Sequence, residues 1–434
     1  MSSDFVRFGD LFDEPQRNGL TRPKKVRGSG LPMVNMGELF AYPRIRDIAM
    51  DLVPVDDKER HYLLKVGDLL FARQSLVLSG AGQCSIFLGN SAPTVFESHL
   101  IRCRLNTSQC NPLFYFYFFR SPEGRRAVES IVEQGAGASG IRGSDLINLE
   151  VPNPPRRTQD EIAAVLGALD DRITLLRETN ATLEAIAQAL FKSWFVDFDP
   201  VRAKMEGRAP EGMDEATAAL FPDSFEETEL GAVPRGWKLG TLGDVAQTAR
   251  SQVQPDAMHS TLHYVGLEHI PRKCLSLSDW GVAEGLESAK SCFVAGDILF
   301  GKLRPYFHKV VVAPMDGVCS TDILVCRPTK PAYYGFVVMQ LFSEALVTYA
   351  DRLSNGAKMP RVNWKDLAAY ELVVPAQDVA EAFTAAVQPL LNRMAANVFE
   401  AKTLATLRDT LLPRLISGQL RLPEAQAELE DALT

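Results

Sequence analysis

Two long stretches of the chain carry apolar residues at alternating steps of four and three positions. The first lies between residues 158 and 194, and the second between residues 378 and 417. Such heptad spacing is typical of a long helix with a narrow apolar seam, which a second helix must cover. Each seam also holds one asparagine, Asn180 and Asn397, and a seam asparagine fixes the register of a coiled coil. We therefore predict that the two stretches are helices that pair with each other.

The seams and their ends give further expectations. Thr158 and Glu161 have the spacing of a capping box, which predicts a helix start. Pro389 lies inside the second pattern, so that helix is expected to kink there or to start late.

Three aromatic residues flank the end of the first seam, namely Phe191, Trp194 and Phe195. The pattern leaves open whether they belong to the core or dock a partner. The assigned seam positions are Ile162, Leu166, Leu169, Ile173, Leu176, Asn180, Leu183, Leu190, Leu390, Met394, Asn397, Leu404 and Leu411.

Each predicted helix follows a stretch in which short apolar runs alternate with Gly and Pro. This pattern predicts strands separated by turns. In the first stretch, the aromatic run 113–119 is expected to be a buried helix or strand. Residues 121–134 are expected to form a helix capped by Ser121.

The two stretches match in order. VGDLLFARQ at 66–74 corresponds to AGDILFGKL at 295–303, and SHLIRCRL at 98–105 to TDILVCRP at 321–328. The segment 137–154 corresponds in the same way to 355–376. We therefore interpret the chain as a duplicated block-plus-helix unit, not as a solenoid, whose repeats are much shorter.

The predicted fold class is α+β, with two duplicated mixed α/β blocks separated by two long helices. We divide the chain into a first block (1–155), a first long helix (156–196), a connector (197–235), a second block (236–376), a second long helix (377–420) and an acidic tail (421–434).

Charge is distributed unevenly over these segments. The whole chain of 434 residues has a net charge of −8. Residues 1–155 carry a net charge of +1 and residues 231–376 one of +2, whereas residues 156–230 carry −8 and residues 377–434 carry −3. A DNA-binding protein needs its positive charge on one face, not in its total, so the two blocks are compatible with DNA binding. The acidic helices are poor surfaces for DNA.

Composition also narrows the class of protein. No apolar run is long enough to span a membrane, and the start of the sequence lacks the pattern of a signal peptide, so we expect a cytoplasmic protein with no membrane partner. The seven cysteines are odd in number and show no C-x-x-C spacing, so we expect reduced thiols.

The sequence offers no convincing cofactor, metal or catalytic site. Gly135, Gly137 and Gly140 form a G-x-G-x-x-G, but it follows a predicted helix and is better interpreted as a flexible loop. The glycines, beside Arg142, would also permit a close approach to a DNA backbone. The N-P-P at 153–155 lacks the aromatic residue of methyltransferases. No P-loop is present, and His259 and His263 lack the H-E-x-x-H pattern.

Polar residues that follow the G-D-[LI]-L-F strands, or precede the last strand of each block, are the candidate DNA contacts. Arg and Lys pair with guanine edges or phosphates, and Gln pairs with adenine. An ordinary solvated position is the alternative for each of them. The candidates are Arg73, Gln74, Ser139 and Arg142 in the first block and Lys302, Arg304, Lys358 and Arg361 in the second.

Taken together, these segments resemble the specificity (S) subunit of type I restriction–modification systems. The resemblance rests on the G-D-[LI]-L-F segments at Gly67 and Gly296 and on the S-D-L and K-D-L segments at Asp145 and Asp366. It also rests on FKSWFVDFDPVRAK, on the connector that leads to GWKLGTLGDV, and on the closing LLPRLISGQL. The first block departs from the pattern, because it begins with FVRFGDL and has no counterpart of the tryptophan at 237.

The resemblance implies that the blocks are two target-recognition domains, each reading half of a bipartite site on double-stranded DNA. It implies an antiparallel coiled coil that acts as a spacer and docks two methylation (M) subunits, with restriction (R) subunits joining the full complex. This chain would be non-catalytic and without a cofactor, whereas the complex would be an adenine-specific DNA methyltransferase and ATP-dependent endonuclease. The alternatives are a DNA-reading scaffold of another phage-defence methylation system and a stand-alone DNA-modifying enzyme.

Overall fold

The computed structural model describes residues 4–135, 137–354, 359–421 and 423–425. Contacts divide the chain into two compact units. Unit 1 comprises Met1–Arg172 together with Leu404–Thr434, and unit 2 comprises Ile173–Thr403. Each unit therefore contains one block and a part of each long helix.

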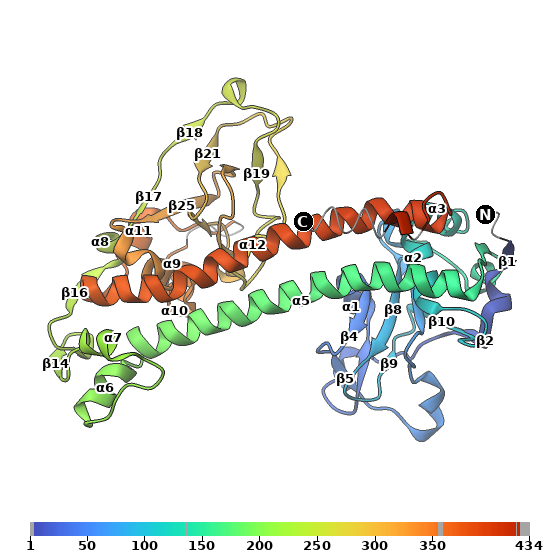
Figure 1. The fold of residues 1–434 in the computed structure, drawn as a ribbon, viewed down its shortest axis with the longest axis horizontal. Helices are drawn as coiled ribbons and strands as arrows, with labels where there is room; N and C mark the ends of the chain where they lie inside the picture. Colours follow the sequence, from blue (N-terminus) through green and yellow to red (C-terminus); the bar gives the residue numbers. More distant parts are fainter. Residues whose placement is uncertain (1–3, 136, 355–358, 422, 426–434) are drawn as a thin grey trace. The chain divides into compact units, whose positions relative to one another are not determined.

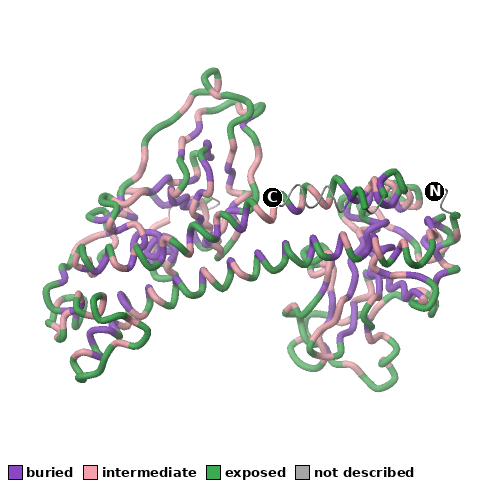
Figure 2. The backbone as a smooth tube through the Cα atoms, viewed as in Figure 1, coloured by how far each residue is buried: buried purple, intermediate pink, exposed green. Residues whose placement is uncertain are grey.

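The long helices are α5 (Arg156–Phe195) and α12 (Gln377–Ile416), each of 40 residues (Figure 1). They pack against each other as a coiled coil, and within unit 2 they are antiparallel, because Asn180 bonds to Asn397 whereas the later Phe191 contacts the earlier Phe383. The predicted fold class is thus confirmed. Buried positions recur among exposed ones along α5 (Figure 2), as the seam requires.

Three local expectations need correction. Helix α5 begins two residues before Thr158, so that residue is not its N-cap. Helix α12 passes through Pro389, which rules out a late start. Helix α3 (Pro122–Glu129) ends earlier than expected, because Glu133 and Gln134 form a strand. Ser121 does cap α3, since its side chain accepts a hydrogen bond from the Gly124 N–H.

Unit 1 holds its block on a five-stranded sheet. Its order is β2 (Phe12–Asn18), β10 (Leu100–Leu105), β6 (Leu69–Ala72), β8 (Cys84–Gly89) and β4 (Arg44–Arg46). The smaller sheets are β5 (Asp51–Val53), β3 (Leu31–Val34) and β9 (Val95–Phe96); β11 (Glu133–Gln134), β12 (Ser139–Gly140) and β7 (Gln74–Ser75); and β1 (Phe5–Arg7) with β13 (Glu150–Pro152). The remaining helices are α1 (Met36–Ala41), α2 (Pro112–Arg120) and α4 (Gly143–Leu146). The aromatic run is therefore a buried helix.

Unit 2 holds its block on a four-stranded and a five-stranded sheet. The first is β17 (Ala246–Thr248), β25 (Ile323–Pro328), β22 (Ile298–Gly301) and β23 (Val310–Val312). The second is β18 (Gln252–Val253), β21 (Lys290–Phe293), β24 (Gly317–Cys319), β19 (His263–Val265) and β20 (Gly281–Val282). Two-stranded pairs are β14 (Phe225–Thr228) with β15 (Gly231–Pro234) and β16 (Lys238–Thr241) with β26 (Glu371–Val374). Its helices are α6 (Asp199–Met205), α7 (Glu215–Ala219), α8 (Leu242–Val245), α9 (Tyr334–Phe342), α10 (Glu344–Leu353) and α11 (Trp364–Ala368).

The two blocks share the hydrogen bonds that define their sheets. In both, the glycine of the G-D-[LI]-L-F segment has a positive φ, +93° at Gly67 and +87° at Gly296. The aspartate that follows it accepts two hydrogen bonds from one arginine of the next matched strand. The pairs are Asp68 with Arg104 and Asp297 with Arg327. The G-D segment is therefore part of the framework, since its aspartate joins two neighbouring strands.

The structure also places the start of the first block, which the sequence left unclear. The Phe8 N–H donates to the Leu149 oxygen at 2.8 Å, and the Leu242 N–H donates to the Tyr370 oxygen at 2.9 Å. The segments Phe8–Leu11 and Leu242–Val245 therefore occupy equivalent places. In the sequence, only a shared Gly-Asp pair indicated that the two segments correspond. In the structure, both segments occupy the same place because each bonds to the residue directly before the last strand of its block.

Phe191, Trp194 and Phe195 lie in the core of unit 2. None is more than 9% exposed, and all three rings approach Phe383 of α12. This placement decides between the two interpretations of these aromatic residues in favour of the core. The connector supplies further aromatic side chains to the same core, among them Phe198 and Phe221.

Candidate nucleic-acid interface

The candidate residues of the first block lie together along one small sheet. Strand β7 pairs with β12, which places Gln74 opposite Gly140. Arg73 directly precedes β7, and its carbonyl oxygen accepts a hydrogen bond from the Ile141 N–H at 2.9 Å. The pairing of β11 with β12 brings Ser139 back to the strand that follows G-D-L-L-F. Gln74 is exposed, and Arg73 and Ser139 are half-buried.

The second block has an equivalent edge with different side chains. We use 'edge' for the residues that directly follow the G-D-[LI]-L-F strand together with the residues that pair with them. Leu303 forms an antiparallel bridge with Arg361, and the Val362 N–H donates to the Lys302 oxygen at 3.1 Å. The Arg304 N–H donates to the Pro360 oxygen at 2.8 Å. Three of the four candidates in this block are therefore neighbours. The fourth, Lys358, lies outside the described residues.

Two of the candidate arginines form ion pairs. Arg142 contacts Glu133 at 2.6 Å, and Arg361 contacts Asp322 at 2.8 Å. The hydrogen bond from Arg361 to Asp322 raises the pKa of the arginine. Exposed pairs of this kind contribute little to stability, so a phosphate can replace the carboxylate at small cost.

The sequence did not point to two further residues whose carbonyl oxygens accept hydrogen bonds from the edges. The Arg73 N–H donates to the His99 oxygen at 2.8 Å, and the Lys302 N–H donates to the Asp322 oxygen at 2.9 Å. His99 and Asp322 occupy equivalent places at the start of the matched segments SHLIRCRL and TDILVCRP. The repeat itself was the signal that could have found them.

The assigned seam residues of α5 and α12 differ in burial. Three are half-buried, namely Leu183, Leu190 and Leu390, and Leu391 beside the last is 5% exposed. Ten are buried: Ile162, Leu166, Leu169, Ile173, Leu176, Asn180, Met394, Asn397, Leu404 and Leu411.

Polar contacts fix the helices within each unit. In unit 2, the Asn397 side-chain amide donates to the Asn180 side-chain oxygen at 2.8 Å, and the Asn180 amide donates to the Met394 carbonyl oxygen at 3.0 Å. In unit 1, Arg408 and the Tyr117 hydroxyl both donate to Asp170, at 2.6 Å and 2.7 Å. Any other pairing of the helices in either unit would leave these buried groups without their partners.

The second block also contacts α5 through Glu184. The Leu275 N–H donates to this carboxylate at 2.7 Å. Glu184 is 8% exposed, and burial raises the pKa of its carboxyl group, although the Leu275 hydrogen bond acts in the opposite direction.

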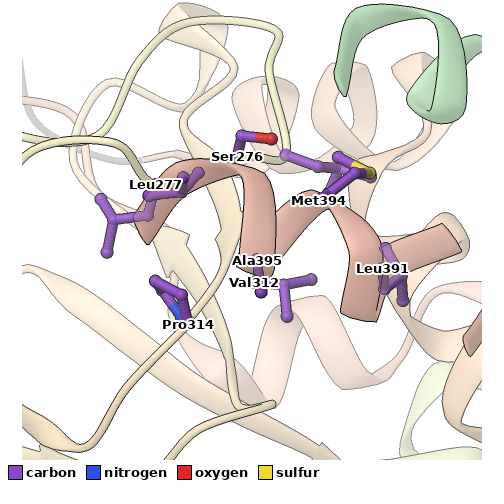
Figure 3. Close-up of a pocket in the computed structure, with 9 residues that line it drawn as sticks. Ser276, Leu277, Val312, Pro314, Leu391, Met394 and Ala395 are labelled. Carbon is purple, nitrogen blue, oxygen red and sulfur yellow. The ribbon is translucent and has the colours of Figure 1, made fainter. Parts of the chain in front are cut away.

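Each unit has a cavity among its described residues. One cavity of about 20 Å³ lies in unit 2 between α12 and the second block (Figure 3). Leu277, Val312 and Met394 are among its lining residues, and it has room for about one water molecule. A wider groove of about 360 Å³ in unit 1 is lined by Asp10, Asp13 and Glu14 among others. These carboxylates would repel phosphate.

Within the described part of the chain, no cluster of His, Cys, Asp and Glu has the arrangement of a metal site. No helix there is long and apolar enough to cross a membrane. All seven cysteines are free thiols.

Comparison with known proteins shows which family this chain resembles. Residues 4–185 match the model of the type I restriction modification DNA specificity domain. The predicted resemblance to type I specificity subunits is thereby confirmed.

Relatives extend the similarity over most of the chain. The specificity subunit of type I restriction enzyme HindI from Haemophilus influenzae is 27% identical and covers 82% of this chain and 87% of its own. That of MjaIX from Methanocaldococcus jannaschii is 24% identical, with 72% and 69% covered. The crystal structure of a type I S subunit from M. genitalium has a TM-score of 0.54 at 14% identity, covers 95% of this chain and 96% of its own, and supports the fold.

Proposed function

We propose that this chain is the DNA sequence-specificity subunit of a type I restriction–modification complex. The first and second blocks would be its target-recognition domains, and each would read one half of a bipartite site on double-stranded DNA. The observation that carries the proposal is the duplicated edge, in which the same hydrogen bonds hold different side chains. Arg73 and Gln74 stand where the second block has Lys302 and Leu303.

The two blocks have the same main-chain framework but different side chains at their edges, and this combination suits the reading of two different half-sites. Main-chain hydrogen bonds hold each edge, so the side chains there are free to differ without loss of the fold. Arg and Lys at these edges would contact phosphates or guanine, and Gln74 would contact adenine. The candidate contacts remain those named from the sequence, with Ser139, Arg142, Arg304, Lys358 and Arg361 completing the set.

The coiled coil of α5 and α12 would hold the recognition domains apart and dock two methylation subunits, with restriction subunits joining the full complex. Each helix has 40 residues. A helix rises about 1.5 Å per residue, so each is about 60 Å long. The acidic charge of residues 156–230 disfavours contact with DNA along this segment. Catalysis would reside in the partners, as adenine methylation and ATP-dependent cleavage, and this chain would act in the cytoplasm without a cofactor.

Mapping of methylated adenines tests this proposal. The chain would be expressed with its neighbouring methylation gene in a host that lacks adenine methylation, and the genome would then be sequenced for modified bases. A split motif with one modified adenine in each half is the expected result. A contiguous motif, or methylation by this chain alone, would contradict it. Methylation without any restriction partner in the gene neighbourhood would favour a methylation-only defence scaffold.

A further inference from the structure

A second feature stands beside the candidate edge of the second block. Strands β22 and β23 are joined by a hairpin loop whose centre is a single turn, Pro305–Phe307. Pro305 is buried in this turn, whereas the Tyr306 side chain is 50% exposed. The turn directly follows Lys302 and Arg304, so the exposed ring belongs to the same loop as these basic residues.

The loop that carries Tyr306 is held in an uncommon backbone conformation. Arg304 and His308, which flank the turn, have φ values of +50°. Non-glycine residues in this region persist only where the surroundings hold them. Here the surroundings do so, because the His308 side chain donates from Nε2 to the Phe342 oxygen at 2.9 Å and its carbonyl oxygen accepts from the Lys273 N–H at 2.9 Å.

The aromatic neighbour of Tyr306 is fixed as well. The Arg272 guanidinium lies 3.9 Å from the centroid of the Phe307 ring, and the Phe307 and Tyr306 rings meet edge to face at 4.6 Å. Tyr306 therefore packs on a ring that is itself held by a cation–π contact, and such packing lowers the entropy that its side chain would lose on contact with another molecule.

The first block has exposed apolar side chains at the equivalent place. Leu76, Val77 and Leu78 follow Gln74 in the loop between β6 and β8, and they are 89%, 61% and 48% exposed. Apolar side chains gain nothing from exposure to water. Both loops therefore expose bulky side chains directly after the basic residues of the matched segments.

We propose that Tyr306 is a specificity-determining residue of the second block, whose ring packs against a base of the half-site which that block reads. This inference rests on the proposed DNA-reading function. Arginine and lysine on the same edge would hold the backbone, and the ring would contact either the methyl group of a thymine or a base step that it partly unstacks. The apolar loop of the first block would make a different contact in the other half-site.

Selection from random-sequence DNA tests the inference. The full chain, assembled with its methylation subunits, would select duplexes from a random library, as wild type and as Tyr306→Ala, Tyr306→Phe and Val294→Ala. Val294 is the matched control, because it is 46% exposed near the opposite end of β22. Tyr306→Ala is expected to lose preference at one or two positions of a single half-site and to weaken binding by about tenfold. Tyr306→Phe and Val294→Ala should keep the wild-type preference.

Two substitutions in the selected DNA separate the forms of contact. Replacement of thymine by deoxyuridine at the affected position should reproduce the loss if the ring contacts the methyl group. A rise in 2-aminopurine fluorescence at that step, present with wild type and absent with Tyr306→Ala, would show unstacking.

Unchanged selection and affinity for Tyr306→Ala would overturn the inference, as would reduced association with methylation subunits at unchanged DNA preference. If the wild-type assembly selects no sequence at all, the proposed function itself fails.

Discussion

The first and second blocks share one framework, but they bury its central ion pair to different depths. Asp68 and Arg104 have side chains only 1% and 8% exposed, whereas Arg327 is 40% exposed beside Asp297. Glu14 also contacts Arg104 in the first block. The hydrogen-bond geometry was thus maintained while its environment changed, so the same contact should contribute unequally to stability in the two blocks.

The largest expected effect is therefore on this pair. Arg104→Ala should destabilise the first block by about 3–5 kcal/mol, because it leaves the buried Asp68 without its cation. Arg327→Ala should cost the second block less, about 1–3 kcal/mol, because water reaches that pair. Hydrogen exchange followed by mass spectrometry would measure both blocks in one protein. Equal losses of protection would contradict the argument from burial.

The next largest effect is expected at the asparagine pair of the coiled coil. The Asn180 side-chain oxygen accepts its hydrogen bond from Asn397 in a buried seam. Asn397→Leu should cost about 1–3 kcal/mol, because that oxygen loses its donor. Changing both asparagines to leucine should restore stability, since two apolar groups need no partner. Chemical denaturation of the single and double variants would give the coupling energy. A double variant as unstable as the sum of the singles would argue against direct pairing.

The unequal edges predict separable effects on DNA. Arg73→Ala should alter selection in one half-site and Lys302→Ala in the other, each by about 1–3 kcal/mol if the residue contacts a base. If the residue contacts a phosphate, its loss would instead weaken binding to all sequences equally. It would also reduce the slope of log affinity against log salt concentration by about one. Selection from random DNA at two salt concentrations distinguishes these cases. Either variant changing both half-sites would refute the assignment of one block to each half.

The smallest expected effect is on the pH dependence of stability, to which Glu14 and Glu184 should contribute in opposite directions. Burial acts to raise the pKa of Glu14, but the hydrogen bond and charge of Arg104 and the charge of Arg102 lower it to about 2. Its contribution to stability is therefore present above its ordinary pKa of 4.5 and lost as the pH falls through about 2. The pKa of Glu184 is raised, so its contribution is complete below 4.5 and lost as the pH rises through the folded value.

Unfolding measured from about pH 2 to pH 7 would test this contrast. Glu184→Gln should remove a loss of stability that the wild type shows on going to neutral pH. Glu14→Gln should remove a gain over the same range. If both variants changed the pH profile in the same sense, burial would not be the cause at Glu184.

Features that repeat along the chain could be predicted from the residue pattern alone. The heptad spacing gave both long helices, whose observed ends at Arg156, Phe195, Gln377 and Ile416 lie within one or two residues of the ends of the two heptad stretches. The second helix nevertheless ends four residues before the predicted boundary at residue 420. The matched segments gave the duplication, because framework contacts such as Asp68 with Arg104 require the same residue types in both blocks. These signals are local or periodic, so they can be read without the fold.

Contacts between residues far apart in the sequence became visible only in the folded chain. Ser139 joins the strand of Gln74, and Arg361 joins Leu303, through strand pairing between segments far apart in sequence. The burial of Trp194, the equivalence of Phe8 with Leu242, and the exposure of Tyr306 likewise depend on packing partners that no spacing reveals. Residue pattern specifies which faces must be covered, whereas the geometry of folding selects what covers them and what remains at the surface.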